Sequence, residues 1–162
     1  MILLRPTEVD DLSYVVAAEQ HDDNNAFIIP WTYDQHRGAL FGTDLAHLIV
    51  EDESDKPVGF IILAGLESPH QNIEFRRLVI TQKAKGYGQE AIQQVQRFAF
   101  TRLSAHRLWL DVKESNRRAR YIYEKLGFRE EGILRECLKN GEQFESLVVM
   151  SMLSHKYFQQ PA

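Results

Sequence analysis

The stretch QKAKGYGQEA at residues 82–91 places two lysines and two glycines between an apolar run and an amphipathic run. Glycine destabilises a helix interior by about 1 kcal/mol relative to alanine, so glycines at a helix entrance indicate that a ligand approaches the backbone closely. Free N–H groups and the positive end of the helix attract anions there, phosphate above all. Lys83 and Lys85 would add positive charge for further phosphates. We therefore predict a phosphate-binding loop and call residues 82–89 the phosphate loop.

Two other interpretations of these glycines are open from the residues alone. Gly86 and Gly88 could simply make a turn, and GYGQEA also fits the G-x-G-x-x-A pattern of dinucleotide-binding domains. Asp111 lies 25 residues after Gly86, near the spacing of the acid that binds a ribose in such domains. However, three β-rich runs precede the loop without crossover helices, so a doubly wound parallel sheet cannot be assembled. A dinucleotide-binding oxidoreductase domain is therefore the weaker alternative.

The runs on both sides of the phosphate loop predict the elements that hold it. Three β-rich runs precede it and form an antiparallel meander, at residues 46–52, 56–66 and 71–80. A helix, a strand and a second helix follow it, at residues 91–103, 107–112 and 115–128. Ser115 or Asn116 caps the second helix, and Gly127 lies just past its end, where a left-handed residue is needed.

The two ends of the chain add further strands and helices. Residues 2–6 form a first strand, and Thr7 with Asp10 resembles a capping box for a helix whose Val9 side chain points inward. Thr32 caps a short second helix. The tail forms a hairpin that turns at Asn140 and Gly141, the strongest short hairpin signal. The predicted fold class is α/β (α+β): one domain over residues 1–162, with a single mixed, mostly antiparallel sheet and helices on both faces.

Composition narrows the classes of protein to which the chain can belong. It has 162 residues, 44% of them hydrophobic, and a net charge of −4, which disfavours non-specific binding to nucleic acid or to an anionic membrane. The longest apolar runs are shorter than the roughly 20 residues that span a bilayer. The single cysteine, Cys137, lies in a strand and is expected to be buried and inert. A cytoplasmic location is expected.

Two blocks together resemble the GNAT superfamily of acetyl-CoA-dependent N-acetyltransferases. The phosphate loop is similar to that family's [QR]-x-x-G-x-[GA] pyrophosphate loop, with Lys83 in the place of Gln or Arg and Ala84 in the place of a common glycine. The block NRRARYIYEKLGF at residues 116–128 is similar to the family's N-x-x-A-x-x-x-Y-E-K-x-G-F element. The order of elements also matches. Within the family, the paired N-terminal helices and the tail look most like the branch that acetylates protein N-termini and polyamines.

The resemblance implies acetyl-CoA as co-substrate and no metal. It implies that the cofactor is bound by Leu78, Val79, Ile80, Lys83, Lys85, Gly86, Tyr87, Gly88, Gln89 and Asn116. Leu78 to Ile80 would hold the pantetheine arm through backbone groups, because in the family this strand splays from its neighbour. It also implies that Tyr123 is the general acid, although a helical stripe of core residues would equally include this tyrosine.

Acetyl transfer also needs a proton acceptor, because an amine with a pKa of about 10.4 is charged at neutral pH. Glu74 is the candidate base, since it lies in a strand on the face opposite Ile73 and Phe75. It could instead pair with Arg76 or Arg77, or be a solvated charge. Asp111 is a weaker candidate.

The acceptor is expected between the N-terminal helices, around Phe27, Trp31 and Tyr33, and the strand that bears Glu74. Protein N-termini, polyamines and amino sugars are all open as acceptors, and so is a homodimer as the assembly. The six histidines show no ligand spacing, so no metal site is predicted and most are expected at the surface. We expect direct acetyl transfer in a ternary complex. The alternative is an acyl-CoA-binding sensor that has lost catalysis.

Overall fold

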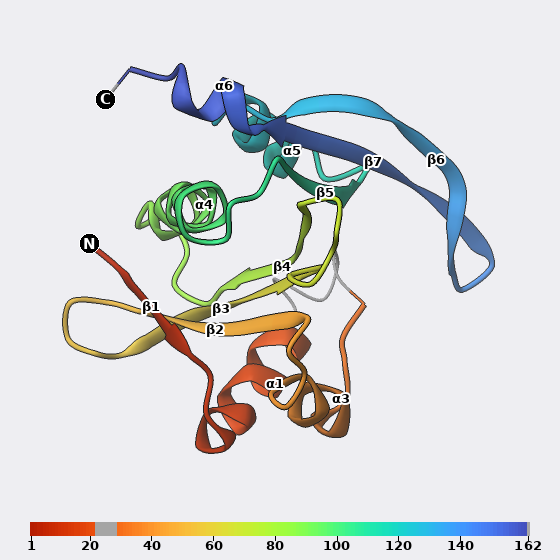
Figure 1. Ribbon diagram of the computed structural model, residues 1–162. Helices are drawn as coiled ribbons and strands as arrows, with labels where there is room; N and C mark the ends of the chain where they lie inside the picture. The colour runs from red at the N-terminus through yellow and green to blue at the C-terminus, as the bar shows by residue number, and fades with distance from the viewer. Residues whose placement is uncertain (22–28, 162) are drawn as a thin grey trace.

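A seven-stranded sheet organises the protein, in the strand order β1-β2-β3-β4-β5-β7-β6 (Figure 1). The computed structural model describes residues 1–21 and 29–161. The strands are β1 (Leu3–Pro6), β2 (Leu45–Glu51), β3 (Pro57–Ala64), β4 (Asn72–Ile80), β5 (Arg107–Lys113), β6 (Arg129–Asn140) and β7 (Gln143–Leu153). Neighbouring strands are antiparallel except β4 and β5, which are parallel. The predicted antiparallel meander over β2, β3 and β4 is confirmed, and so is the mixed sheet.

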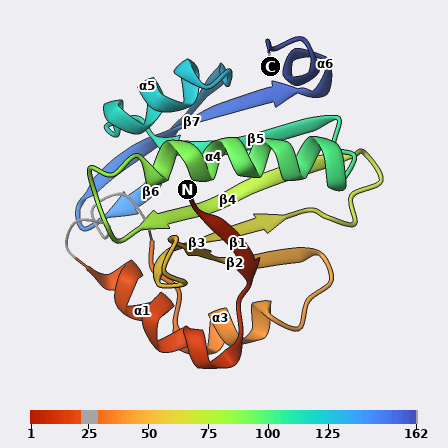
Figure 2. The same ribbon diagram turned by 90° about the vertical axis from the view of Figure 1, so that its left-hand side faces the viewer.

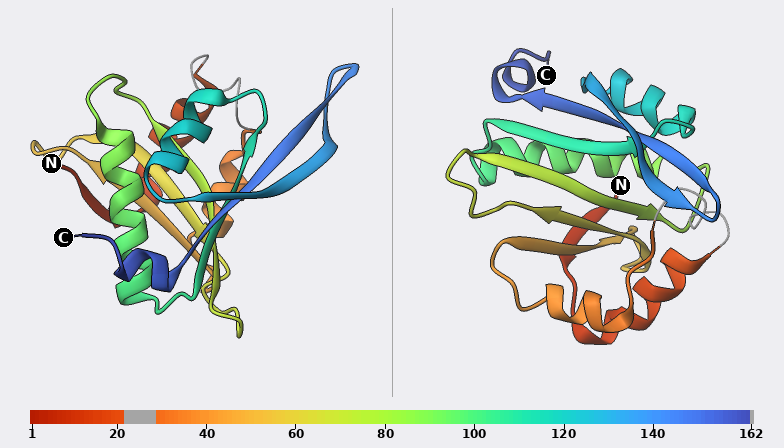
Figure 3. Two further views of the ribbon diagram at one scale, coloured as in Figure 1. Left: turned by 90° about the horizontal axis from the view of Figure 1, so that it is seen from above. Right: turned by 90° about the vertical axis from the view of Figure 1, so that its right-hand side faces the viewer.

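Helices cover both faces of this sheet (Figures 1 and 2). They are η1 (Val9–Asp11), α1 (Leu12–Gln20), α3 (Tyr33–Ala39), α4 (Tyr87–Arg97), η2 (Phe98–Arg102), α5 (Arg117–Lys125) and α6 (Ser154–Phe158). One apolar core joins the sheet to α4, α5 and α6, and a second joins its other face to α1. Strand β3 is buried along almost its whole length because both cores meet on it. The β6–β7 hairpin extends beyond the rest of the sheet (Figure 3).

Local sequence signals explain most helix ends. Thr32 caps α3, where its side chain accepts a hydrogen bond from the N–H of Gln35. Asn116 caps α5 by accepting from the N–H of Ala119 at 3.2 Å. Gly127 follows that helix with φ of 102°, the left-handed conformation that glycine adopts without a steric penalty. These predictions are confirmed.

Two local predictions are wrong. The N-terminal capping box is formed by Glu8 and Asp11 rather than Thr7 and Asp10, and Val9 is 46% exposed on the short turn before α1. Cys137 is exposed, because β6 is an edge strand whose pairing with β7 is interrupted between Leu134 and Leu138. The prediction that most histidines lie at the surface is confirmed, since His21, His70, His106 and His155 are exposed. His36 and His47 are buried.

The central feature for function is where β4 and β5 part. Their pairing is limited to Asn72–Glu74 of β4 and residues 107–109 of β5. Beyond this point β4 continues to pair with β3 up to Ile80 while β5 pairs with β7. The two strands therefore diverge, and their backbone edges border an opening.

Candidate active site

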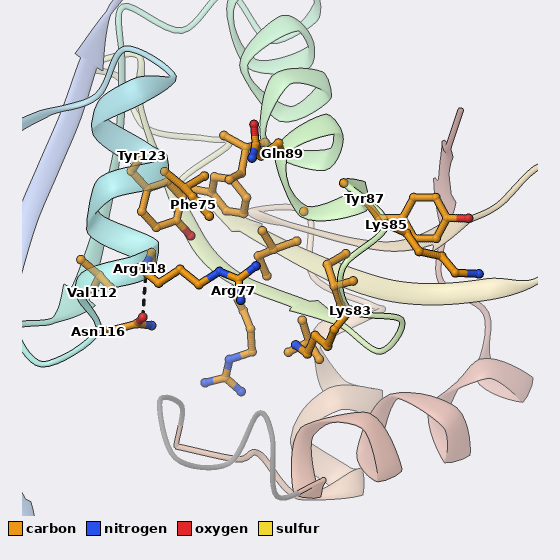
Figure 4. Close-up of a pocket in the computed structure, with 18 of the residues that line it drawn as sticks. Phe75, Arg77, Lys83, Lys85, Tyr87, Gln89, Val112, Asn116, Arg118 and Tyr123 are labelled. Atoms are coloured by element: carbon orange, nitrogen blue, oxygen red, sulfur yellow. Dashed lines mark hydrogen bonds between the residues drawn. The ribbon is translucent and has the colours of Figure 1, made fainter.

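A pocket of about 770 Å³ fills the opening between β4 and β5 (Figure 4). Its walls come from β4, the phosphate loop, the first turns of α4 and α5, and the end of β5. Every residue that the sequence assigned to cofactor binding lines it, namely Leu78, Val79, Ile80, Lys83, Lys85, Gly86, Tyr87, Gly88, Gln89 and Asn116. Tyr123 lines it too. The fold thus brings the two sequence blocks, about 30 residues apart in the chain, to one site.

The phosphate loop ends at the start of α4 in the geometry that a bound anion needs. Gly86 is the cap residue with φ of 77° and ψ of 3°, and no side chain caps the helix. The first N–H groups of α4 therefore remain available to a ligand. Ala84 also has a positive φ, of 62°. A residue with a Cβ is strained there, which explains why a glycine would suit this position of the loop better.

Tyr123 lines the pocket and packs against two other aromatic rings. Its ring is 6.4 Å from that of Phe75 and 5.6 Å from that of Phe128, centroid to centroid, both edge to face. Its hydroxyl points into the pocket (Figure 4). Burial raises the pKa of Tyr123 to about 12, so the phenol is protonated at neutral pH and can donate a hydrogen bond.

The two candidate carboxylates lie differently with respect to the pocket. Glu74 does not line it and instead accepts a hydrogen bond from Arg76 Nε at 2.8 Å. Asp111 lines the pocket. Burial and the nearby charge of Glu74 raise the pKa of Asp111. Of the two, Asp111 therefore has both the access and the perturbed protonation that a proton acceptor needs.

The aromatic residues predicted for the acceptor do not line the pocket in the part of the chain that the structure describes. Trp31 packs between the guanidinium of Arg77 and the ring of His36, each 5.2 Å from its ring centroid. Tyr33 opens α3 and is 42% exposed. Phe27 lies outside the described residues, so its assignment to the acceptor stays a prediction.

Three arginines line the pocket, Arg76, Arg77 and Arg118, and sequence reasoning assigned none of them to it. Arg118 extends from α5 across the opening (Figure 4). Arg77 is placed by a bulge in β4: Ile62 of β3 pairs with Arg77 and the next residue pairs with Phe75, so Arg76 is an extra residue. The bulge moves Arg77 to the face of the sheet that α1 covers. Simple alternation along the strand would put it beside Phe75, so no signal within β4 itself could have found it.

The sheet topology excludes one of the interpretations of the phosphate loop. The sheet has one parallel pair, β4 with β5, rather than the doubly wound parallel arrangement, so the dinucleotide-binding alternative is wrong. No group of three or more potential ligand side chains that could hold a metal ion occurs among the described residues. None of the described helices combines the length and apolar character of a membrane span.

Comparison with known proteins identifies the family. Residues 1–129 match the model of the acetyltransferase (GNAT) domain. The chain is 28% identical over 167 residues to spermidine N(1)-acetyltransferase of Escherichia coli strain K12, covering 96% of this chain and 88% of that protein. It is 30% identical over 111 residues to the spermidine N(1)-acetyltransferase of Vibrio cholerae, covering 67% of this chain and 64% of that one.

Solved structures share the fold. The spermidine N-acetyltransferase of Vibrio cholerae in complex with CoA and spermine superposes with a TM-score of 0.88 at 24% identity, covering 98% of both chains. A dodecameric structure of the Vibrio cholerae enzyme has a TM-score of 0.85 at 24% identity, covering 99% of this chain and 98% of that one. The family match extends over the phosphate loop and Tyr123. The chain therefore belongs to the GNAT acetyltransferase family and is an acetyl-CoA-dependent acyltransferase.

Proposed function

We propose that this protein acetylates a primary amine of a polyamine by direct attack on acetyl-CoA in a ternary complex. The pocket between β4 and β5 is the observation that carries the proposal, because it joins an anion-binding helix end to a buried phenol and a carboxylate. The curated relatives that align with 96% and 67% of the chain are spermidine acetyltransferases, which favours a polyamine over a protein N-terminus or an amino sugar.

In this proposal the cofactor lies along β4. The first N–H groups of α4 bind the pyrophosphate, and Lys83 and Lys85 supply charge near the other phosphates. The backbone groups of Leu78 to Ile80 that face the diverging β5 have no partner strand on that side, so they are suited to hydrogen bonding with the pantetheine amides. Asn116, whose carbonyl caps α5, stands across the same opening.

We assign the acetyl-transfer step to residues at the other end of the pocket. The ammonium loses one proton, and the neutral amine nitrogen attacks the thioester carbonyl carbon. The nitrogen then loses its second proton to solvent and the C–S bond breaks, which leaves an amide and the thiolate of CoA. We assign proton collection to Asp111, directly or through water, and give Glu74 the supporting role of keeping the pKa of Asp111 raised.

Tyr123 would stabilise the leaving thiolate mainly as a hydrogen-bond donor. With its pKa raised to about 12, full proton transfer to a thiolate whose conjugate acid has a pKa of about 8.5 is uphill by roughly 5 kcal/mol. A hydrogen bond that strengthens as charge develops on sulfur has no such cost, because the proton stays on the phenol. Proton delivery to the thiolate can follow from solvent after the product leaves.

The test is an amine panel with acetyl-CoA, followed by release of free thiol. Spermidine and spermine are compared with a peptide that has a free N-terminus, the same peptide blocked at its N-terminus, and glucosamine. Turnover of the polyamines at least tenfold above the peptide is expected. Faster turnover of the free peptide would replace the polyamine by a protein N-terminus. Binding of CoA, measured by calorimetry, without turnover of any amine would favour the acyl-CoA-binding sensor.

A further inference from the structure

Four buried polar side chains and the largely buried Arg77 form a connected chain between α1, α3 and the sheet, and we call these five residues the buried network. The hydroxyl of Thr7 is 2.8 Å from His47 Nδ1, and His47 Nε2 is 3.0 Å from His36 Nδ1. His36 Nε2 is 2.7 Å from Glu19 Oε1, and Glu19 Oε2 pairs with Arg77. Glu19 and His36 are both 0% exposed. The chain connects α1, α3, β2 and β4, and it ends at a residue of the pocket wall.

The ionisation of Glu19 and His47 limits which groups of the buried network can donate hydrogen bonds. Burial acts to raise the pKa of Glu19, but the hydrogen bond from His36 and the charge of Arg77 outweigh it and leave that pKa lowered. Glu19 is therefore an ionised acceptor, and His36 must donate to it through Nε2. Burial and the neighbouring His36 lower the pKa of His47 to about 4, so His47 is neutral at pH 7. The hydrogen bonds from Thr7 to His47 and from His47 to His36 continue the chain, with donor and acceptor set by the tautomers of the two rings.

Glu19 also fixes the surroundings of Arg77. One of its oxygens accepts the N–H of Trp31 at 3.0 Å. Arg77 in turn donates to the carbonyl of Ile29 at 2.9 Å, and its guanidinium stacks 5.2 Å from the ring centroid of Trp31. As a result the Arg77 side chain is only 10% exposed, whereas the neighbouring Arg76 side chain is 39% exposed.

The charge of Arg77 is relevant to the acceptor. Polyamines and other aliphatic amines reach the enzyme as ammonium ions, and a like charge on the pocket wall repels them. The charge of Arg77 is neutralised by the carboxylate of Glu19, which forms an ion pair with it. Tyr14 of α1 contacts Thr81 at the end of β4 at 2.8 Å, so α1 is attached to β4 at a second point. These two contacts position the Glu19 carboxylate of α1 beside the pocket.

We propose that Glu19 is a positioning residue that neutralises Arg77 and holds its guanidinium against Trp31, so that a cationic amine can bind in the pocket. His36, His47 and Thr7 keep Glu19 ionised and oriented. This inference rests on the proposed function in one respect, that the acceptor is a cation. Among the described residues, the hydrogen bonds and ion pairs that connect the buried network include neither the phosphate loop nor Tyr123, so its loss should affect the amine rather than the cofactor.

The kinetic test uses Glu19→Gln and the double variant Glu19→Gln/Arg77→Gln, with spermidine as acceptor. Glu19→Gln leaves Arg77 uncompensated, and we expect the KM for spermidine to rise about tenfold while the KM for acetyl-CoA changes by less than about twofold. The double variant removes both charges and should return the KM for spermidine to within about threefold of the wild type. An equal rise in both KM values, or a double variant no better than Glu19→Gln, overturns the proposal.

The matched control is Glu51→Gln, which breaks another partly buried arginine pair. Glu51 accepts from Arg5 Nε at 2.5 Å on the β1–β2 side of the sheet, and neither residue lines the pocket. This variant should leave both KM values unchanged. Should Glu19→Gln fail to fold, the double variant decides alone, because the proposal requires a KM for spermidine close to that of the wild type once both charges are gone.

A second measurement does not depend on turnover. Modification of arginines by phenylglyoxal is mapped by mass spectrometry, with Arg76 as the internal reference on the same strand. In the wild type Arg77 should be protected, and in Glu19→Gln it should react at a rate close to that of Arg76. Protection of Arg77 in both proteins overturns the inference. If the wild type acetylates no amine, the proposed function fails, and this mapping still decides whether Glu19 immobilises Arg77.

Discussion

His47 couples the stability of the protein to pH in a way that can be measured. Its folded-state pKa is about 4, below the ordinary value of 6.5, because the ring is buried and lies beside His36. Between these two pKa values the unfolded chain binds a proton that the folded chain does not, so the stability contributed by His47 is lost as pH falls from 6.5 to 4. Glu19, Arg77 and Asp11 are the other charged groups that act on His47.

The magnitude follows from the two pKa values. Between pH 7 and pH 4.5, proton binding to His47 of the unfolded chain lowers the free energy of unfolding by about 2.4 kcal/mol. For a domain with a typical stability of about 5–15 kcal/mol, that is a large fraction. Carboxylates with lowered pKa values, such as Asp11, add to the loss mainly below this range.

The assay is urea unfolding followed by far-UV circular dichroism at pH 7 and at pH 4.5, for the wild type and His47→Gln. The variant has no group to titrate at this position, so its loss between the two pH values should be smaller than that of the wild type by about 2.4 kcal/mol, whatever its stability at pH 7. His70→Gln, at an exposed position, is the control for replacing a histidine by glutamine. An equal loss in the wild type and His47→Gln would refute the reasoning.

Two further predictions concern the pocket. Tyr123→Phe keeps the ring contacts with Phe75 and Phe128 but removes the hydroxyl. The kcat should therefore fall by about 10²-fold, while the Kd for acetyl-CoA stays within about twofold of the wild type. An unchanged kcat in the thiol-release assay would remove Tyr123 from the mechanism. Gly86→Ala should lower stability by about 1–2 kcal/mol and weaken CoA binding in calorimetry, because the added Cβ meets no atom within 4 Å but the backbone has φ of 77°. Gly132→Ala is the control, since Gly132 also has open space and no positive φ, and equal effects of the two substitutions would contradict this argument.

The strands, helices and turns were predicted largely from local rules. Period-two and helical patterns located the sheet and α4, an Asn cap and a glycine located the ends of α5, and Asn140 with Gly141 located the hairpin turn. Such signals act over a few residues, so they are present in the sequence in full. Neither of the two blocks that implied a CoA site was sufficient alone. Only their joint presence distinguished a CoA site from a plain turn or a dinucleotide site.

Residue roles that depend on distant contacts could not be read in this way. The strand pattern left Glu74 open as a base or as a partner of Arg76 or Arg77; in the folded protein it pairs with Arg76, and Asp111 lines the pocket instead. His36 and His47 are 11 positions apart in segments with no common pattern, and they meet only because α3 packs on β2. The exposure of Cys137 likewise depends on which strand lies at the edge of the sheet.

The succession of elements, the phosphate loop and the type of cofactor site could be predicted from the sequence, because propensity, capping and glycine conformations are local properties. The charge at the pocket wall, in contrast, depends on how distant segments pack. One extra residue in β4 turns Arg77 toward α1, where a buried glutamate from 58 positions earlier in the chain meets it. Burial makes that pairing strong, and burial is a property of the packed molecule rather than of any segment.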